Sequence, residues 1–156
     1  MIKKLFGFGI CLLLLCSCSI YTPFFIQNHS SEKVEVKITV DSRLKEFVLE
    51  GSYKLLWREG IVKPKKFHKG EAPGEIDLVP VNDSVMVVTL PKNSTVRLIS
   101  SHNFRFGIIV KSIELNGKKM TMNEILDDSE RKGGYFLYKT LSHKVCKLKN
   151  HHRDLY

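Results

Sequence analysis

Hydrophobic and polar residues alternate strictly from residue 34 to residue 40. The hydrophobic positions of this segment are Val34, Val36, Ile38 and Val40. Because successive side chains of an extended strand point to opposite faces, all four fall on one face and the polar residues on the other. The alternation therefore predicts a strand with one buried face. The polar segment Asn28–Ser31 predicts a turn, so we expect Phe24–Ile26 to pair with this strand in a hairpin.

Further segments have the composition of strands. Hydrophobic, β-branched and aromatic residues dominate 47–49, 53–57, 85–90, 95–99 and 135–140, and such residues suit a pleated, half-buried surface. Pro91–Asn93 lies between two of these segments and predicts a second hairpin, of 85–90 with 95–99. Val145–Leu148 is a candidate for one more strand.

Asn116-Gly117 is the strongest turn signal in the chain, because both positions tolerate the positive φ angles of a tight hairpin. A two-residue turn here pairs Ile113 with Met120 on the buried face. The same register pairs Glu114 with Lys119 on the exposed face, where opposite charges are favourable. The sequence therefore predicts a hairpin with a defined register.

A capping box follows this hairpin at Thr121-Met122-Asn123-Glu124, ahead of Ile125-Leu126. In this pattern a threonine and a glutamate three residues later satisfy each other's backbone N–H groups at a helix start. We expect one short helix near 122–130 that ends before Gly133-Gly134.

A series of short strands with one small helix predicts an antiparallel β-sandwich, Ig-like or related, with an open β-barrel as the alternative. The chain has no internal repeat and is long enough for one compact domain. We expect this domain to span residues 23–150 and residues 151–156 to form a C-terminal tail.

Residues 58–75 predict a long solvated loop, because prolines, glycines and lysines gather there. Its lysines are Lys63, Lys65, Lys66 and Lys69. If the loop folds back beside Trp57, these lysines together with Trp57 and Phe67 would form an aromatic-lined basic contact patch. The alternative is a core position for Trp57 and solvated lysines.

The first 18 residues have the order of a bacterial export leader. Lys3-Lys4 is followed by the hydrophobic run 5–15 and then by Cys16-Ser17-Cys18, which gives a basic start, an apolar centre and a small-residue exit. The segment Leu15-Cys16-Ser17-Cys18 resembles the lipobox of bacterial lipoproteins. The resemblance implies that residues 1–17 are a cleaved signal peptide. It also implies that Cys18 carries acyl chains such as palmitate at the new N-terminus.

The resemblance implies a location in the cell envelope. There the lipid would anchor the protein to a membrane facing the periplasm, the outer membrane rather than the inner, or would hold it at the cell surface. A signal anchor is the alternative, because hydrophobic residues continue through Ile20 and Pro23–Ile26. Polar residues interrupt this run, however, and a spanning helix needs about 20 mostly apolar residues. We expect residues 18–22 to be the lipidated cysteine and a short tether.

The basic charge of the chain favours anionic partners. The formal net charge is +9, and loss of the leader with its two lysines leaves 139 residues at +7. Such a field attracts phospholipid headgroups, lipopolysaccharide or cell-wall acids. We expect the partners to be the membrane, an anionic envelope component or another envelope protein. An address outside the cytoplasm argues against nucleic acid.

No motif in the sequence names a reaction. The histidines and cysteine at His143, Cys146, His151 and His152 match no zinc spacing, and Asp127, Asp128 and Glu130 suit a solvated acidic face better than an acid/base pair. Asp83-Ser84-Val85 is similar to a short bacterial O-glycosylation acceptor. We expect no metal, no cofactor and no catalytic residue, and hence a non-catalytic binding or scaffolding module. A small lipid-anchored hydrolase or carbohydrate-acting enzyme is the alternative.

Overall fold

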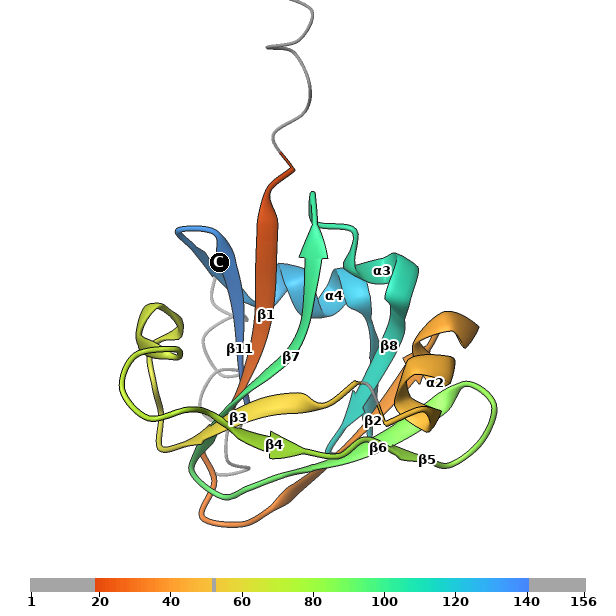
Figure 1. Cartoon of the computed structure of the whole chain (residues 1–156), viewed down its shortest axis with the longest axis horizontal. Helices are drawn as coiled ribbons and strands as arrows, with labels where there is room; N and C mark the ends of the chain where they lie inside the picture. Colours follow the sequence, from red (N-terminus) through yellow and green to blue (C-terminus); the bar gives the residue numbers. More distant parts are fainter. Residues whose placement is uncertain (1–18, 52, 141–156) are drawn as a thin grey trace, which may run out of the picture.

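The computed structural model describes residues 19–51 and 53–140, and these form two β-sheets (Figure 1). The first sheet has the strand order β10-β11-β1-β7-β3-β4. Its strands are β1 (Tyr21–Asn28), β3 (Leu55–Glu59), β4 (Gly74–Ile76), β7 (Ser94–His102), β10 (Glu130–Lys132) and β11 (Tyr135–Thr140). Neighbouring strands are antiparallel except β1 and β11, which run parallel.

The second sheet is antiparallel throughout, with the order β5-β6-β2-β8-β9. Its strands are β2 (Val34–Val40), β5 (Val79–Pro80), β6 (Val85–Leu90), β8 (Val110–Leu115) and β9 (Lys118–Thr121). The helical segments are α2 (Ser42–Leu49), α3 (Phe106–Ile109), α4 (Met122–Asp127) and the 3-10 turn η1 (Pro64–Lys66). Among the residues described, no helix is long and apolar enough to cross a membrane.

The hydrophobic core lies between the two sheets. Phe24 and Ile26 of β1 are fully buried, as is Met86 of β6 in the facing sheet, and all three belong to one cluster. Phe106 of α3 and Ile125 of α4 are fully buried in the same cluster. Side chains from both sheets therefore share one core, which confirms the predicted β-sandwich.

The expected hairpins of 24–26 with 34–40 and of 85–90 with 95–99 are both wrong, although their strands are present. β1 and β2 lie in different sheets, and so do β6 and β7. The buried side chain of Asn28 joins these two sheet-to-sheet connections, because its amide group donates to the carbonyls of Glu32 and Pro91, each at 2.8 Å. The polar turns are thus present where the sequence predicts them, but each carries the chain from one sheet to the other.

The segment 47–49 belongs to helix α2 rather than to a strand. Leu44 and Val48 of this helix are both buried against the core. Residues four apart lie on the same face of a helix, so α2 packs one face against the core. A three-residue hydrophobic run such as 47–49 does not by itself distinguish a strand from a helix.

The local signals near residue 116 are confirmed in detail. Leu115 pairs with Lys118, and Ile113 pairs with Met120. Ile113 and Met120 are both buried. The turn residues Asn116 and Gly117 have positive φ angles of 52° and 76°. The Glu114 carboxylate lies 3.4 Å from Lys37 of the neighbouring strand β2. Helix α4 begins with the predicted capping box and ends at Asp127, while the two glycines form the later β10–β11 turn.

Candidate functional site

The lysine-rich loop covers the outer face of the first sheet. Phe24 points into the core, so Phe25, the next residue of β1, points to the opposite face. There Phe25 meets Phe67 of the loop, with ring centroids 5.1 Å apart, and Leu137 of β11 completes this second, smaller cluster. Phe67 is 0% exposed. The expectation that Phe67 offers an aromatic contact surface is therefore wrong, because its ring holds the loop on the sheet.

Polar contacts hold the same loop at several points. The Arg58 guanidinium donates to the backbone carbonyls of Phe67 and Glu71. The Val62 N–H donates to Thr95 Oγ1 at 2.8 Å, and the Gln27 amide donates to the Val62 carbonyl at 2.9 Å. These bonds run from three strands of the first sheet to the loop, so the loop has a defined position despite its solvated sequence.

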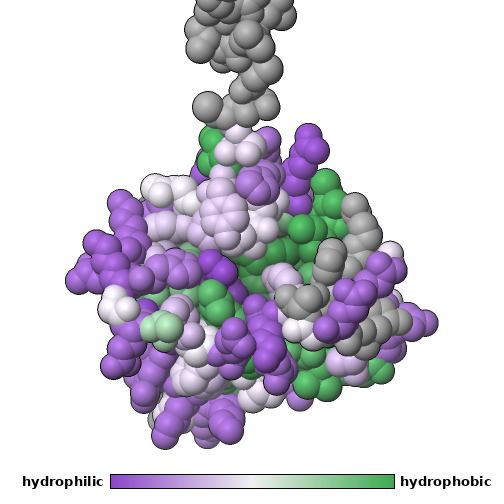
Figure 2. All heavy atoms as spheres, viewed as in Figure 1, coloured by the Kyte–Doolittle hydropathy of each residue, from purple (hydrophilic) through white to green (hydrophobic). Residues whose placement is uncertain are grey.

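The four lysines of the loop are divided between two clefts. Lys66 and Lys69 line a cleft of about 570 Å³ with Trp57, which we call the tryptophan cleft. Lys63 and Lys65 line a second cleft of about 490 Å³ on the other side of the loop, which we call the lysine cleft. Figure 2 shows strongly hydrophilic side chains over the loop side of the molecule, at the left of the view. The predicted basic patch is thus two sites rather than one.

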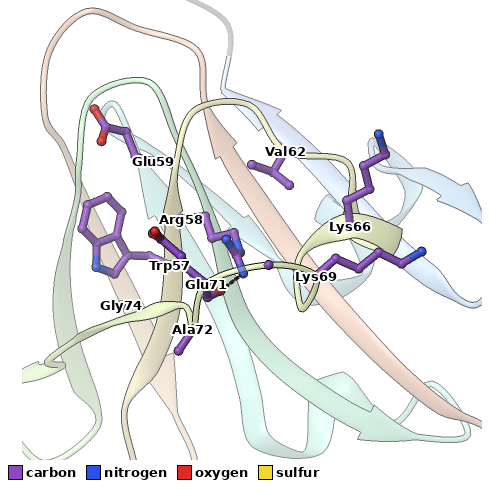
Figure 3. Close-up of a pocket in the computed structure, with 10 residues that line it drawn as sticks. Trp57, Arg58, Glu59, Val62, Lys66, Lys69, Glu71, Ala72 and Gly74 are labelled. Carbon is purple, nitrogen blue, oxygen red and sulfur yellow. Dashed lines mark hydrogen bonds between the residues drawn. The ribbon is translucent and has the colours of Figure 1, made fainter.

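The tryptophan cleft does not bring its aromatic and basic groups together. Trp57 packs partly against the core, and Gly74 of the neighbouring strand β4 leaves room for its indole ring. Figure 3 shows that Lys66 and Lys69 extend away from Trp57. The carboxylates Glu59 and Glu71 belong to the same lining. The aromatic-lined basic patch expected at Trp57 is therefore not formed here, because the lysines lie on the opposite side of the cleft.

We expect Gly74→Ala to displace the Trp57 ring. A Cβ at position 74 would stand 2.5 Å from Trp57 Nε1 and 3.2 Å from Cδ1, far inside van der Waals contact. Such overpacking costs about 1–3 kcal/mol. Trp57 is the only tryptophan, so a shift of the emission maximum reports its displacement directly. Gly107→Ala is the control, because nothing lies within 4 Å of its added Cβ; identical emission from the two variants would contradict the prediction.

The lysine cleft lies between the loop and the β10–β11 hairpin. Its polar lining consists of Gln27 and His29 from the end of β1, Lys63 and Lys65 from the loop, and Glu130, Lys132, Tyr135 and Lys139 from the hairpin. The Lys65 side chain reaches the hairpin turn, where its Cε would lie 3.3 Å from a Cβ on Gly133. Segments more than sixty residues apart in sequence therefore meet at one cleft.

Positive charge dominates the lysine cleft. Its one carboxylate, Glu130, pairs with both hairpin lysines, Lys139 and Lys132, the latter at 3.2 Å, and these contacts lower the pKa of Glu130. Within the described part of the chain, no carboxylate lies within ion-pair distance of Lys63 or Lys65. The ammonium groups of Lys63 and Lys65 thus line the cleft without an ion-pair partner among the described residues, which suits an anionic ligand.

Neighbouring side chains already engage the acid–base groups His29 and Glu130 of the lysine cleft. His29 shares a hydrogen bond with Gln27 Oε1 at 3.3 Å rather than with Glu130. Partial burial and the charge of Lys139 lower the pKa of His29, which favours its neutral ring. Among the described residues of this lining there is no serine, threonine or cysteine. The described groups can hold an anion, but they do not align a base with a nucleophile.

The sequence predicts two of the four lysines that line this cleft. Lys63 and Lys65 were predicted as contact residues, whereas Lys132, Lys139 and His29 were not, because nothing local marks them as neighbours of the loop. Cys18 and the group His143, Cys146, His151 and His152 lie outside the described residues. Ser84 is exposed in the β5–β6 turn, and Asp127 and Asp128 are exposed at the end of α4.

Comparisons with known proteins find no relative: no protein-family model matches the chain, and no curated protein or solved structure matches it at a significant level.

Proposed function

We propose that this protein is a lipid-anchored module of the bacterial cell envelope that binds an anionic envelope component without transforming it. The lysine cleft is the binding site, and Cys18 is the anchor. The observation that carries the proposal is the convergence of Lys63, Lys65, Lys132 and Lys139 on one cleft with a single carboxylate.

The rigidity of the cleft supports specific binding. Lys63 and Lys65 flank Pro64, which is buried, and the loop is fixed by Phe67 and by the bonds to Val62. A lysine whose backbone is already ordered loses less conformational freedom on binding than one in a free loop. The cleft therefore presents its charges at defined positions, as a site for phosphate or carboxylate groups requires.

The chemistry of the lining supports a binder over a hydrolase. An enzyme of either alternative class needs a base or nucleophile within hydrogen-bond reach of a second catalytic group. In the lysine cleft the carboxylate of Glu130 is engaged by two lysines and His29 by Gln27. These groups position and neutralise each other, and we propose no reaction.

We expect the double change Lys63→Gln and Lys65→Gln to weaken binding of inorganic pyrophosphate and of an anionic envelope glycolipid. Each lysine close to an anionic surface contributes about 1 kcal/mol, so the two together correspond to about a 30-fold loss of affinity at low salt. Titrations followed by NMR on the chain from Ser19 onward measure the change. Binding by the unchanged protein should also weaken as salt rises, since ions screen exposed charges.

The matched control is Lys66→Gln with Lys69→Gln, which removes the same charge from the same loop outside the lysine cleft. This control pair should retain nearly all of the affinity. An equal loss in both pairs would show that only net charge matters, and the lysine cleft would not be a site.

A further inference from the structure

The first described residues are held against the turn between β7 and α3. The Ile20 N–H donates to Asn103 Oδ1 at 2.9 Å, and the Asn103 N–H donates to the Ile20 carbonyl, also at 2.9 Å. Ser19 Oγ lies 3.2 Å from His102 Nδ1, and β1 begins at Tyr21. Residues 19–22 are therefore part of the folded domain, and the expected tether over 18–22 is corrected to a far shorter one.

This short connection constrains where a membrane can lie. Cys18 directly precedes Ser19, and consecutive Cα atoms are only about 3.8 Å apart. The inference rests on the proposed anchor: acyl chains on Cys18 would leave the domain directly at this end. In Figure 1 the start of β1, the end of β7 and helix α3 lie together at this end, at the top of the view.

Hydrophobic side chains are exposed at the same end. Ile20 is 51% exposed, Tyr21 52% and Ile108 of α3 44%, which are three of the six large hydrophobic residues exposed in the described part of the chain. Tyrosine suits a membrane interface, because its ring is apolar and its hydroxyl group is polar. The Tyr21 ring rests edge-on against His102, with centroids 5.6 Å apart.

Basic residues belong to the same segment as Ile108. Residues 102–111 contain Arg105 and Lys111, and no Asp or Glu. The Arg131 guanidinium stacks over the Phe104 ring of the same turn, 4.5 Å from its centroid. Exposed hydrophobic residues among basic ones are the pattern of a surface that lies in the headgroup region of an anionic membrane.

We propose that this end of the sandwich, which we call the anchor end (residues 19–21 and 102–109 with Arg131), lies against the membrane that holds the Cys18 lipid. The partner is the headgroup and upper acyl region of an anionic bilayer. The axes of strands β1, β7 and β11 then extend away from the membrane, so the lysine cleft on the outer face of their sheet opens to the side. A ligand of that cleft therefore approaches alongside the membrane rather than from the bilayer that carries the anchor.

The test uses the processed, lipidated full chain in vesicles of phosphatidylethanolamine and phosphatidylglycerol. Spin labels are placed singly on Ile108→Cys and Lys92→Cys, the second at the opposite end of the sandwich, in a Cys146→Ser background. We expect the label at 108 to lose most of its relaxation by a water-soluble paramagnetic reagent and to gain relaxation by oxygen, while the label at 92 stays accessible from water. Equal accessibility of both labels would overturn the proposal.

Further arms separate the alternatives. Mass analysis of the N-terminal peptide is run first, and absence of lipid would refute the proposed anchor. If the chain is lipidated but the label at 108 is exposed to water, only the proposed position of the anchor end is refuted. Protection that vanishes at one protein per vesicle would assign the surface to a protein partner and overturn the proposal. Asn103→Gly, which suits the φ of 52° but removes the side-chain bond from the Ile20 N–H, should reduce protection; Asn116→Gly, also at φ 52°, should not.

Discussion

Phe67→Ala is expected to release the lysine-rich loop from the first sheet and to destabilise the protein by about 3–5 kcal/mol, the usual cost of truncating a fully buried aromatic side chain. Phe67 is 0% exposed and fills the space between Phe25 and Leu137 on the outer face of the sheet. The polar bonds of Arg58 and Gln27 to the loop would then have to order it without a hydrophobic contact. Urea unfolding of the chain from Ser19 onward measures the free energy.

Limited trypsin digestion measures the release of the loop itself. Cleavage after Lys65, Lys66 and Lys69 should be much faster in Phe67→Ala than in the unchanged protein, because a protease needs an extended, detached segment. Ile61→Ala is the matched control, since Ile61 belongs to the same loop but is 40% exposed. Unfolding midpoints and cleavage rates that agree between the two variants would mean that Phe67 does not hold the loop.

Cys18→Ala is expected to abolish lipidation completely. In the proposed lipoprotein the Cys18 sulfur is the attachment point of the lipid, and cleavage of the leader follows attachment. The variant should therefore incorporate no fatty-acid probe and should retain residues 1–17, which mass spectrometry detects. Each buried CH₂ group contributes about 0.8 kcal/mol to membrane binding, so the loss of several acyl chains removes the whole anchor.

Cys16→Ala provides the control for this prediction. It exchanges a neighbouring cysteine for another small residue and leaves the pattern of Leu15 and Cys18 intact. It should be labelled and processed like the unchanged protein. If the unchanged protein begins at Met1 and takes up no lipid, the proposed anchor is wrong. If the lipid is found on Cys16, the anchor residue is Cys16 and not Cys18.

The fold class and two of the four lysines of the lysine cleft could be predicted from the sequence. The strands 34–40, 85–90 and 135–140 agree with the structure residue for residue, because each carries its own pattern of hydrophobic residues. The segment 47–49 was mistaken for a strand, because a short hydrophobic run alone does not distinguish a strand from a helix. Lys132 and Lys139 were not predicted as residues of this cleft, because the sequence around a solvated lysine does not show which distant segment it will contact.

The sequence by itself determined the features that depend on residues close along the chain. The Asn116-Gly117 hairpin with its register and the capping box at Thr121 are of this kind, because their favourable φ angles and hydrogen bonds are complete within a few residues. The net positive charge also follows from composition alone.

Only the tertiary structure decided which strands share a sheet, which aromatic residue is buried and which lysines face one cleft. Strand partners depend on how all hydrophobic faces are covered at once: β1 lies between β7 and the distant β11 because Phe24 must face the core while Phe25 meets Phe67 and Leu137 outside it. Lys63 and Lys139 become neighbours through that same arrangement. Such long-range packing is a property of the whole chain, so no local pattern encodes it.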